Sequence, residues 1–100
     1  MLFAFICKDK PGKLQLRLDL RPDHVVHLET LNQNGTLKFA GPCLGEDGKP
    51  IGSLVVVEAA DAAQAKSIAH SDPFAKGGLF ESVEIHPWNW TFNNPANPKS

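Results

Sequence analysis

The sequence predicts an α+β domain of the ferredoxin-like class, with four strands and two main helices in the order βαββαβ. One observation is the length, because 100 residues form a single hydrophobic core. A second is the alternation of segments rich in branched and aromatic residues with segments of helical periodicity, separated by turns that contain Gly or Pro. This order normally produces one four-stranded antiparallel sheet with both helices on the same face.

The first strand is expected over Leu2–Lys8, where aromatic and branched residues precede the turn Asp9–Gly12. This strand is apolar on both faces, and the side chains alternate as follows: Leu2, Ala4 and Ile6 on one face, and Phe3, Phe5 and Cys7 on the other. Because the helices cover only one face, the other needs a cover. A second copy of the sheet around a two-fold axis is the simplest cover, so we predict a homodimer with facing sheets.

Residues 13–34 show helical spacing with a proline inside it. Because proline removes a backbone hydrogen bond and clashes with the preceding turn, Pro22 predicts a break near Leu20. We therefore expect a short helix followed by a second helix over 22–34, which ends at Asn34-Gly35.

A hairpin with a long loop is expected next. Leu37–Cys43 and the Val-rich segment Ser53–Ala59 are typical of strands, and residues 44–52 contain turn-forming Gly and Pro. The Ala-rich segment Asp61–His70 predicts the second main helix, with Asp61 as its N-cap.

The last part of the chain predicts a short helical turn, a strand and a tail. Pro73 ends the second main helix, and the helical turn is expected at Phe74–Lys76. Alternating residues over Leu79–Trp88 predict the fourth strand. We expect residues 1–100 to form one domain whose polar C-terminal segment, from about residue 93, is a flexible tail.

Composition excludes several classes of protein. With 42% hydrophobic and 21% charged residues, the chain is neither disordered nor a coiled coil. A formal net charge of -1 argues against nucleic acid or an anionic membrane as a partner. No apolar stretch approaches the roughly 20 residues that cross a bilayer. We expect a cytoplasmic protein in which Cys7 and Cys43 are reduced.

Polar residues occupy helix positions where a core belongs. If residues 13–34 are treated as one continuous helix, these side chains share a stripe roughly 80° wide: Arg17, Arg21, His24, Leu28 and Leu31. The expected break makes the position of Arg17 uncertain, but the spacing of His24, Leu28 and Leu31 lies within one helix. His24 is therefore either a buried structural histidine bonded to the backbone or a general acid/base.

Asp72 also has two interpretations. An Asp before a Pro is a common N-cap of a following helical turn. In the predicted fold, this junction could also approach His24, where a carboxylate would orient the imidazole and fix its tautomer.

Other candidate sites have weaker support. His24 and His27 are three residues apart, but no third ligand has suitable spacing, so we expect no metal site. The aromatic residues Trp88, Trp90 and Phe92 are either packing residues of a dimer or cleft wall, or a surface for ligand stacking.

Four motifs in fixed order carry a family resemblance. They are Arg21-Pro22-x-His24 on the helix, Gly41-Pro42 toward the end of the second strand, Asp72-Pro73-Phe74 after the second helix, and a Val-x-x-x-Pro ending at Val83–Pro87. In these motifs and their spacing the chain resembles, over nearly its whole length, the YciI-like (YCII-related) family of the dimeric α/β-barrel superfamily.

The resemblance implies a ferredoxin-like homodimer with its active site at His24 and Asp72. It also indicates candidate substrate-binding residues: Arg17, Arg21, Gly41, Pro42 and Phe74. The activity it implies is that of a small lyase or isomerase that needs no cofactor and acts on a small oxygenated or chlorinated ring compound, as a dehydrochlorinase or muconolactone isomerase does. The alternative is a non-catalytic dimeric domain that binds a small ligand or serves in a stress response.

Overall fold

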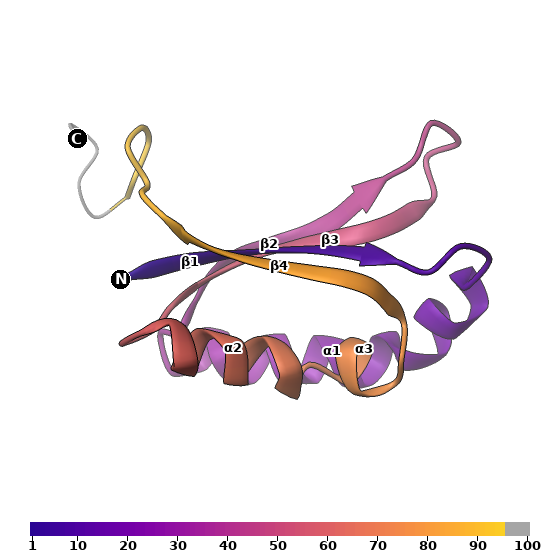
Figure 1. Ribbon diagram of the computed structural model, residues 1–100, viewed down its shortest axis with the longest axis horizontal. Helices are drawn as coiled ribbons and strands as arrows, with labels where there is room; N and C mark the ends of the chain where they lie inside the picture. The colour runs from indigo at the N-terminus through magenta and orange to yellow at the C-terminus, as the bar shows by residue number, and fades with distance from the viewer. Residues whose placement is uncertain (96–100) are drawn as a thin grey trace.

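The computed structural model describes residues 1–95, which form one four-stranded antiparallel sheet with its helices packed against one face (Figure 1). The strand order is β2-β3-β1-β4, so the α+β, ferredoxin-like prediction is confirmed. The elements are β1 (Leu2–Asp9), α1 (Leu14–Gln33), β2 (Leu37–Leu44), β3 (Pro50–Glu58), α2 (Ala62–Ser71), α3 (Pro73–Lys76) and β4 (Phe80–Trp88).

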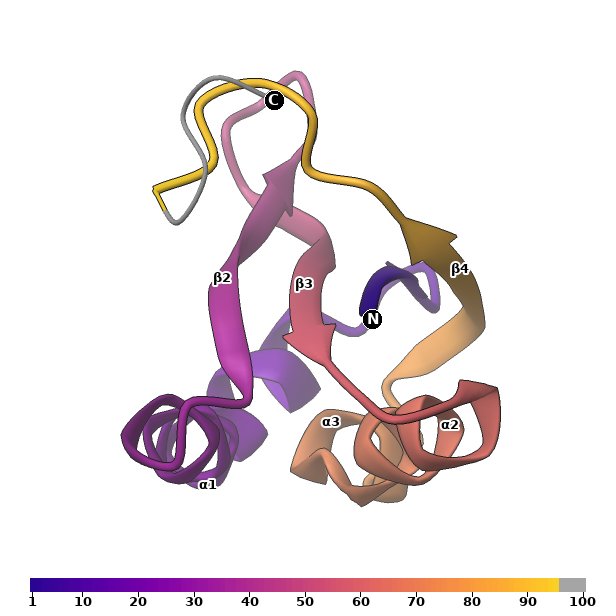
Figure 2. The same cartoon turned by 90° about the vertical axis from the view of Figure 1, so that its left-hand side faces the viewer.

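The hydrophobic core lies between the sheet and the helices. In the central strands, Phe3 pairs with Val57 and Phe5 with Val55, so these four side chains share one face and are almost fully buried. Figure 2 shows α1 beneath the β2 side of the sheet and α2 with α3 beneath the β4 side. The small residues of α2 let this helix approach the phenylalanines closely.

The predicted break at Pro22 is wrong, because α1 is one helix of 20 residues with Pro22 inside it. Proline costs the helix the hydrogen bond to the carbonyl of Leu18. Both residues are exposed, so water can bond to that carbonyl. Buried side chains on both sides of the proline, Arg17 and His24, hold the two halves against the same surface.

The loop of the hairpin is shorter than predicted. We expected residues 44–52, but β2 extends to Leu44 and β3 begins at Pro50, which leaves a tight turn. Glycine at position 52 serves a strand and not a loop, because a Cβ there would overlap the carbonyl oxygen of Cys7 in the neighbouring strand.

The remaining elements follow the prediction to within one or two residues. The Asp61 carboxylate accepts a hydrogen bond from the Gln64 N–H at 2.8 Å, as an N-cap does. The predicted helical turn is α3, and β4 starts one residue later than expected. Of the predicted tail, residues 96–100 lie outside the described part of the chain.

The face of the sheet that carries no helix is apolar along the middle of β1 and β3 and only partly covered, whereas β4 places His86 and Glu84 on it, opposite Ala4 and Ile6. Ala4 and Val56 pair on this face and are buried. The rings of Phe39, Trp88 and Trp90 meet there, with Phe39 5.6 Å from Trp88 and 4.9 Å from Trp90 between centroids. Further along the same face, the paired residues Ile6 and Leu54 remain 45% and 38% exposed.

Candidate functional site

The structure brings together His24, in the middle of α1, and Asp72, between α2 and α3. The His24 Nδ1 lies 2.8 Å from Asp72 Oδ1 and 3.0 Å from Oδ2, and both side chains are buried. Asp72 Oδ1 also accepts the Phe74 N–H at 2.9 Å, so the same carboxylate caps α3. The two interpretations of Asp72, as a cap and as a partner of His24, therefore hold together.

This contact indicates the tautomer of the imidazole. A carboxylate only accepts hydrogen bonds, so Nδ1 carries the hydrogen that His24 donates. Within residues 1–95, Nε2 has no hydrogen-bond partner, and no fully buried side-chain nitrogen or oxygen lacks one. Nε2 is therefore accessible, with a lone pair that can take a proton.

Phe74 holds the imidazole from its flat side. The two rings are stacked with centroids 3.8 Å apart and an angle of 13° between their planes. Phe74 is fully buried, and Phe80 of β4 contacts it edge-on at 6.0 Å. With Nδ1 bonded to Asp72 and the ring face covered, His24 has little freedom to rotate.

Arg17 is bound by protein groups in a buried network. Its Nε donates to Asp9 Oδ2 at 2.7 Å, and its Nη2 donates to the Ser53 hydroxyl and the Gly52 carbonyl, each at 2.7 Å. The guanidinium carbon also lies 4.6 Å from the centroid of the Phe74 ring. Arg17 thus connects the end of the sheet to the ring that supports His24.

A cavity of about 280 Å³ opens beside His24, between α1 and the β2 side of the sheet. Its lining includes the predicted residues Arg17, Arg21, His24, Gly41, Pro42 and Phe74, and in addition Leu18, Val25, Leu28, Ala40, Pro50, Ser53 and Val55. Asp72 is not in this lining; it lies behind His24. The cavity suits a small ring compound, because most of its wall is apolar and a few polar groups converge on it.

Arg21 is the exposed cation of this cavity. It forms no ion pair with any residue in the described part of the chain, whereas Arg17 is neutralised by Asp9. Of the two arginines, Arg21 has its guanidinium available for an anionic group of a ligand.

Sequence reasoning missed Asp9 and Ser53. The sequence pattern places Asp9 in a turn and Ser53 at the start of a strand, and it predicts no functional role for either residue. A polar residue at the start of a Val-rich strand was the available signal for Ser53, which is 3% exposed. Nothing in the local sequence connects Asp9 to Arg17.

Two further side chains near the site, those of Cys7 and His27, have shifted pKa values. Burial raises the pKa of the Cys7 thiol to about 12, and the nearby Asp72 and Asp9 add to the effect, so Cys7 stays protonated. Cys43 is exposed on β2, and neither thiol is in a disulfide. Burial also lowers the pKa of His27, although the charge of Asp72 opposes this shift.

Residues 1–95 contain no cluster of three or more His, Cys, Asp or Glu side chains arranged to bind a metal ion. In the same range, no helix combines the length and the apolar character needed to span a bilayer.

Comparison with known proteins shows similarity over almost the whole chain. A model of the YCII-related domain matches residues 1–89. Protein YciI of Escherichia coli and that of Shigella flexneri are each 32% identical over 98 residues, which is 92% of this chain and all of the relative. The derivative of benzaldehyde biosynthesis cluster protein C of Emericella nidulans is 33% identical over 72 residues, which is 65% of this chain and 74% of the relative.

Among solved structures, 5-chloro-2-hydroxyhydroquinone dehydrochlorinase (TftG) of Burkholderia phenoliruptrix, in complex with 2,5-dihydroxybenzoquinone, is similar to this chain. It has 35% sequence identity and a TM-score of 0.81, over 89% of this chain and 94% of that one. A NIPSNAP family protein of Agrobacterium tumefaciens shares only the fold, with 18% identity and a TM-score of 0.54 over 94% of this chain and 95% of that one.

Proposed function

The chain belongs to the YCII-related domain family, and on that premise we propose that it is a cofactor-independent lyase or isomerase acting on a small oxygenated ring compound. The observation that carries the proposal is the buried hydrogen bond of 2.8 Å between His24 Nδ1 and Asp72, which leaves Nε2 free beside a cavity. Dehydrochlorination by TftG supports a lyase reaction on a chlorinated hydroxyquinol as the first activity to test.

In this proposal, His24 is the general base and later the general acid. Nε2 removes a proton from the ring compound, and Asp72 stabilises the imidazolium that forms. In the dehydrochlorination, Nε2 removes a hydroxyl proton and the imidazolium returns it to the ring carbon that bears chlorine, which becomes tetrahedral. Nε2 then removes the proton of a second hydroxyl group; the O–H electrons form a carbonyl, the ring π electrons shift to form a C=C bond at the chlorine-bearing carbon, and chloride leaves with the electrons of the C–Cl bond. In an isomerisation, the same imidazolium returns the proton to another carbon.

Arg21 is the group we assign to the anionic oxygen of the substrate. Proton removal from a hydroxylated ring places negative charge on an oxygen, and a guanidinium at the cavity wall stabilises that charge. Gly41, Pro42 and Phe74 form apolar wall against the ring. Arg17 lines the same cavity, but its bonds to Asp9, Ser53 and Gly52 favour a role in holding Phe74 over direct contact with the substrate.

We further propose that the protein is a cytoplasmic homodimer whose two open sheet faces pack together. Support comes from the apolar strip of Ile6 and Leu54 on the face without helices. Burial of each such side chain is worth about 1.5 to 3 kcal/mol, which favours association of two copies.

The test is chloride release from 5-chloro-2-hydroxyhydroquinone under nitrogen, measured by ion chromatography. We expect release with the wild type and with His70→Gln, which changes an exposed histidine of α2 outside the cavity. His24→Ala should reduce the rate at least about 100-fold, since general acid–base catalysis contributes that much or more. It should lower the free energy of unfolding by no more than about 2 kcal/mol.

Two results would contradict this proposal. A folded His24→Ala protein that releases chloride at the wild-type rate would remove His24 from the chemistry. Tight binding of 2,5-dihydroxybenzoquinone without turnover of this or related ring compounds would instead favour a ligand-binding domain.

A further inference from the structure

A second cavity lies at the end of the sheet, outside the His24 site. It has a volume of about 440 Å³ and opens between the β1–α1 turn and the start of β3. Its lining includes four lysines, two aspartates, Gly12, and the apolar residues Leu14, Pro50 and Ile51. None of the predicted site residues belongs to it.

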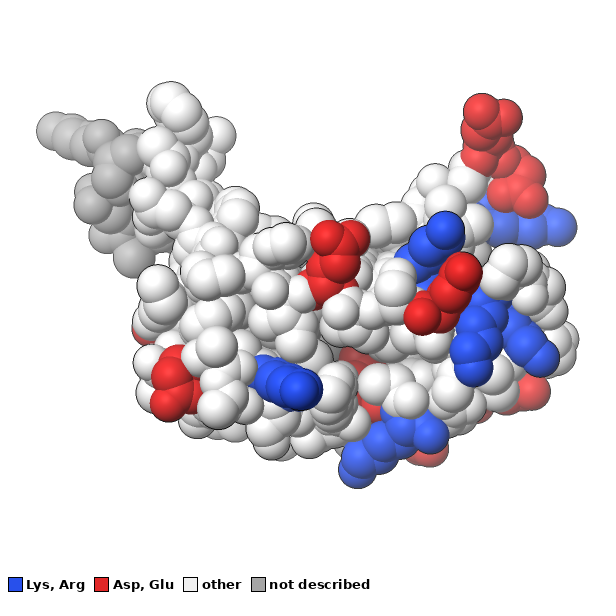
Figure 3. Space-filling model, viewed as in Figure 1, with Lys and Arg blue, Asp and Glu red and all other residues white. Residues whose placement is uncertain are grey.

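The charge of this cavity differs from that of the chain as a whole. Four of the ten Lys and Arg residues line it, against two of the eleven Asp and Glu residues, so its formal charge is +2 on a chain of net charge -1. In Figure 3, Lys and Arg atoms gather at the end of the molecule that carries these turns, with acidic atoms at the tip of the hairpin. The local potential therefore favours an anion.

The lysines of this cavity are largely free. Asp9 is already paired with Arg17 at 2.7 Å, and Lys8 lies 3.9 Å from Glu81. Within the described residues, Lys10, Lys13 and Lys49 form no ion pair. The positive charge of these three side chains is thus available to a ligand.

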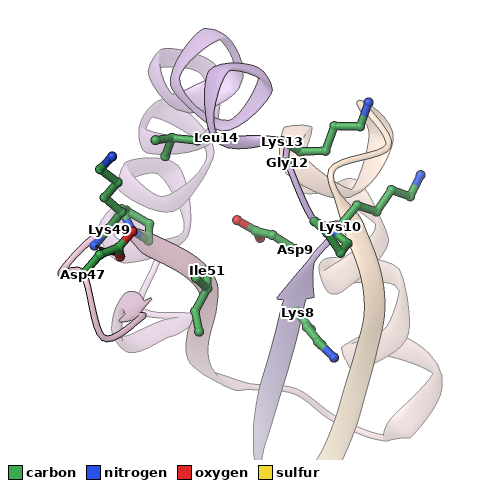
Figure 4. A pocket seen from close by; sticks show the side chains of 11 residues that line it. Lys8, Asp9, Lys10, Gly12, Lys13, Leu14, Asp47, Lys49 and Ile51 are labelled. Atoms are coloured by element: carbon green, nitrogen blue, oxygen red, sulfur yellow. Dashed lines mark hydrogen bonds between the residues drawn. The ribbon is translucent and has the colours of Figure 1, made fainter.

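The shape of the cavity adds an apolar surface to the charge. Figure 4 shows Lys49, Ile51 and Leu14 on one side and Lys10 and Lys13 on the other, with the carboxylate of Asp9, the partner of Arg17, between them. The ammonium groups of Lys10 and Lys13 point away from Lys49, and the flexible lysine stems allow all three groups to turn over the mouth of the cavity. Ile51 is 54% exposed, so an apolar ligand group has a surface to cover.

This cavity shares a wall with the His24 cavity. Asp9 lines one cavity and Arg17 lines the other, and the bond between their side chains joins the two. Pro50 lines both. A ligand that contacts Asp9 is therefore connected through a single ion pair to Arg17, whose guanidinium lies over the Phe74 ring.

We propose that this cavity is a second small-molecule site, which takes an organic anion with a phosphate or carboxylate group on an apolar body. The anionic group binds among Lys10, Lys13 and Lys49 at the rim. The apolar body covers Leu14 and Ile51. The site is independent of the proposed reaction, because its ligand needs no contact with His24.

The test uses binding, so it needs no substrate. Phenyl phosphate, inorganic phosphate and benzyl alcohol are titrated into the ¹⁵N-labelled full-length protein, and backbone amide shifts are followed by NMR. We expect phenyl phosphate to shift Gly12 and Ile51 and to bind about ten-fold more tightly than phosphate, since the phenyl group buries apolar surface. Benzoate, tested in the same way, distinguishes a carboxylate from a phosphate preference.

Matched variants locate the site. Lys13→Gln with Lys49→Gln should weaken phenyl phosphate about five-fold, whereas Lys38→Gln with Lys66→Gln removes the same charge elsewhere and should leave binding unchanged. Ile51→Ser should abolish the preference for phenyl phosphate over phosphate. All these positions are exposed, so each variant should fold.

Three outcomes would overturn the proposal. One is the absence of amide shifts with all anions at millimolar concentration. Another is a pattern of shifts confined to Arg21 and Gly41, which would place binding in the His24 cavity. The third is equal weakening by both pairs of lysine variants, which would mean that the anion responds only to net charge.

Discussion

Asp72 combines two tasks in one carboxylate, and its substitutions can separate them. Asparagine keeps an oxygen for the Phe74 N–H but provides no charge for His24, whereas alanine loses both contacts. We expect Asp72→Asn to lower the free energy of unfolding by less than about 1 kcal/mol and Asp72→Ala by about 1 to 3 kcal/mol. Both should reduce chloride release. Thermal unfolding and the chloride assay measure the two effects.

The control for Asp72 is Asp61, which caps α2 away from the cavity. Asp61→Asn should likewise be more stable than Asp61→Ala, and both variants should release chloride at the wild-type rate. The interpretation of Asp72 is wrong if Asp72→Asn retains the wild-type rate, or if it destabilises the fold as strongly as Asp72→Ala.

His27 makes folding sensitive to acid. Because burial lowers the pKa of His27 in the folded protein, the unfolded chain takes up a proton near pH 6.5 while the folded chain stays neutral. Stability is therefore present above about pH 6.5 and decreases as the pH falls through that value. We expect His27→Gln to lose less stability than the wild type between pH 7 and pH 5, measured by thermal unfolding in the same buffers.

His70→Gln is the control for this effect, since His70 is an exposed histidine at the end of α2, away from the open face of the sheet. The stability of this variant should change between pH 7 and pH 5 as that of the wild type does. If His27→Gln and the wild type lose stability in parallel, burial of His27 does not contribute to the pH dependence.

At the scale of elements, α1 shows how packing overrides a local signal. Pro22 predicts a break from its chemistry, yet the helix continues because Arg17 is bonded to the sheet and His24 to the α2–α3 junction. One consequence is that Arg17 and His24 lie on the same face of α1, as expected if residues 13–34 form one continuous helix. The exposed Arg21 lies between them along the chain, at the cavity.

Replacement of Pro22 tests whether the proline strains the helix. Pro22→Ala restores the hydrogen bond to Leu18 and favours the helix, while it increases the freedom of the unfolded chain. We expect the free energy of unfolding to rise by about 1 to 2 kcal/mol, which corresponds to roughly 4 to 16 °C in melting temperature. Asp23→Ala, at the next exposed position, gives the baseline. A loss of stability in Pro22→Ala alone would show that the proline itself is needed for packing.

At the scale of the whole molecule, the open face of the sheet determines association. We expect light scattering to give twice the chain mass of 10.9 kDa for the wild type. Ile6→Lys should reduce this mass, because it places a charge on the apolar strip. The same lysine lies opposite Glu84 within the sheet, so the monomer should still fold.

Val26→Lys provides the matched control, since Val26 is 60% exposed on α1, away from the open face. Its mass should equal that of the wild type. A wild-type protein that stays monomeric at micromolar concentration would exclude the facing-sheet dimer.

The sequence alone determined the order of elements, the strand β1 with two apolar faces, and the candidate pair of His24 and Asp72. These follow from local patterns, namely the alternation of strand residues, helical spacing, and an Asp before a Pro. The burial of His24 was also predictable from its spacing with Leu28 and Leu31.

Only the tertiary structure decided the contacts between residues distant in sequence. The bond of His24 to Asp72 spans 48 residues, and that of Arg17 to Ser53 spans 36. No local pattern encodes them, because they depend on how α1 packs on β3 and how the α2–α3 junction meets α1. The same packing kept α1 continuous through Pro22, and it formed the Asp9–Arg17 wall between the two cavities. A sequence pattern places a side chain on a face, but the free energy that selects its partner comes from the assembled core.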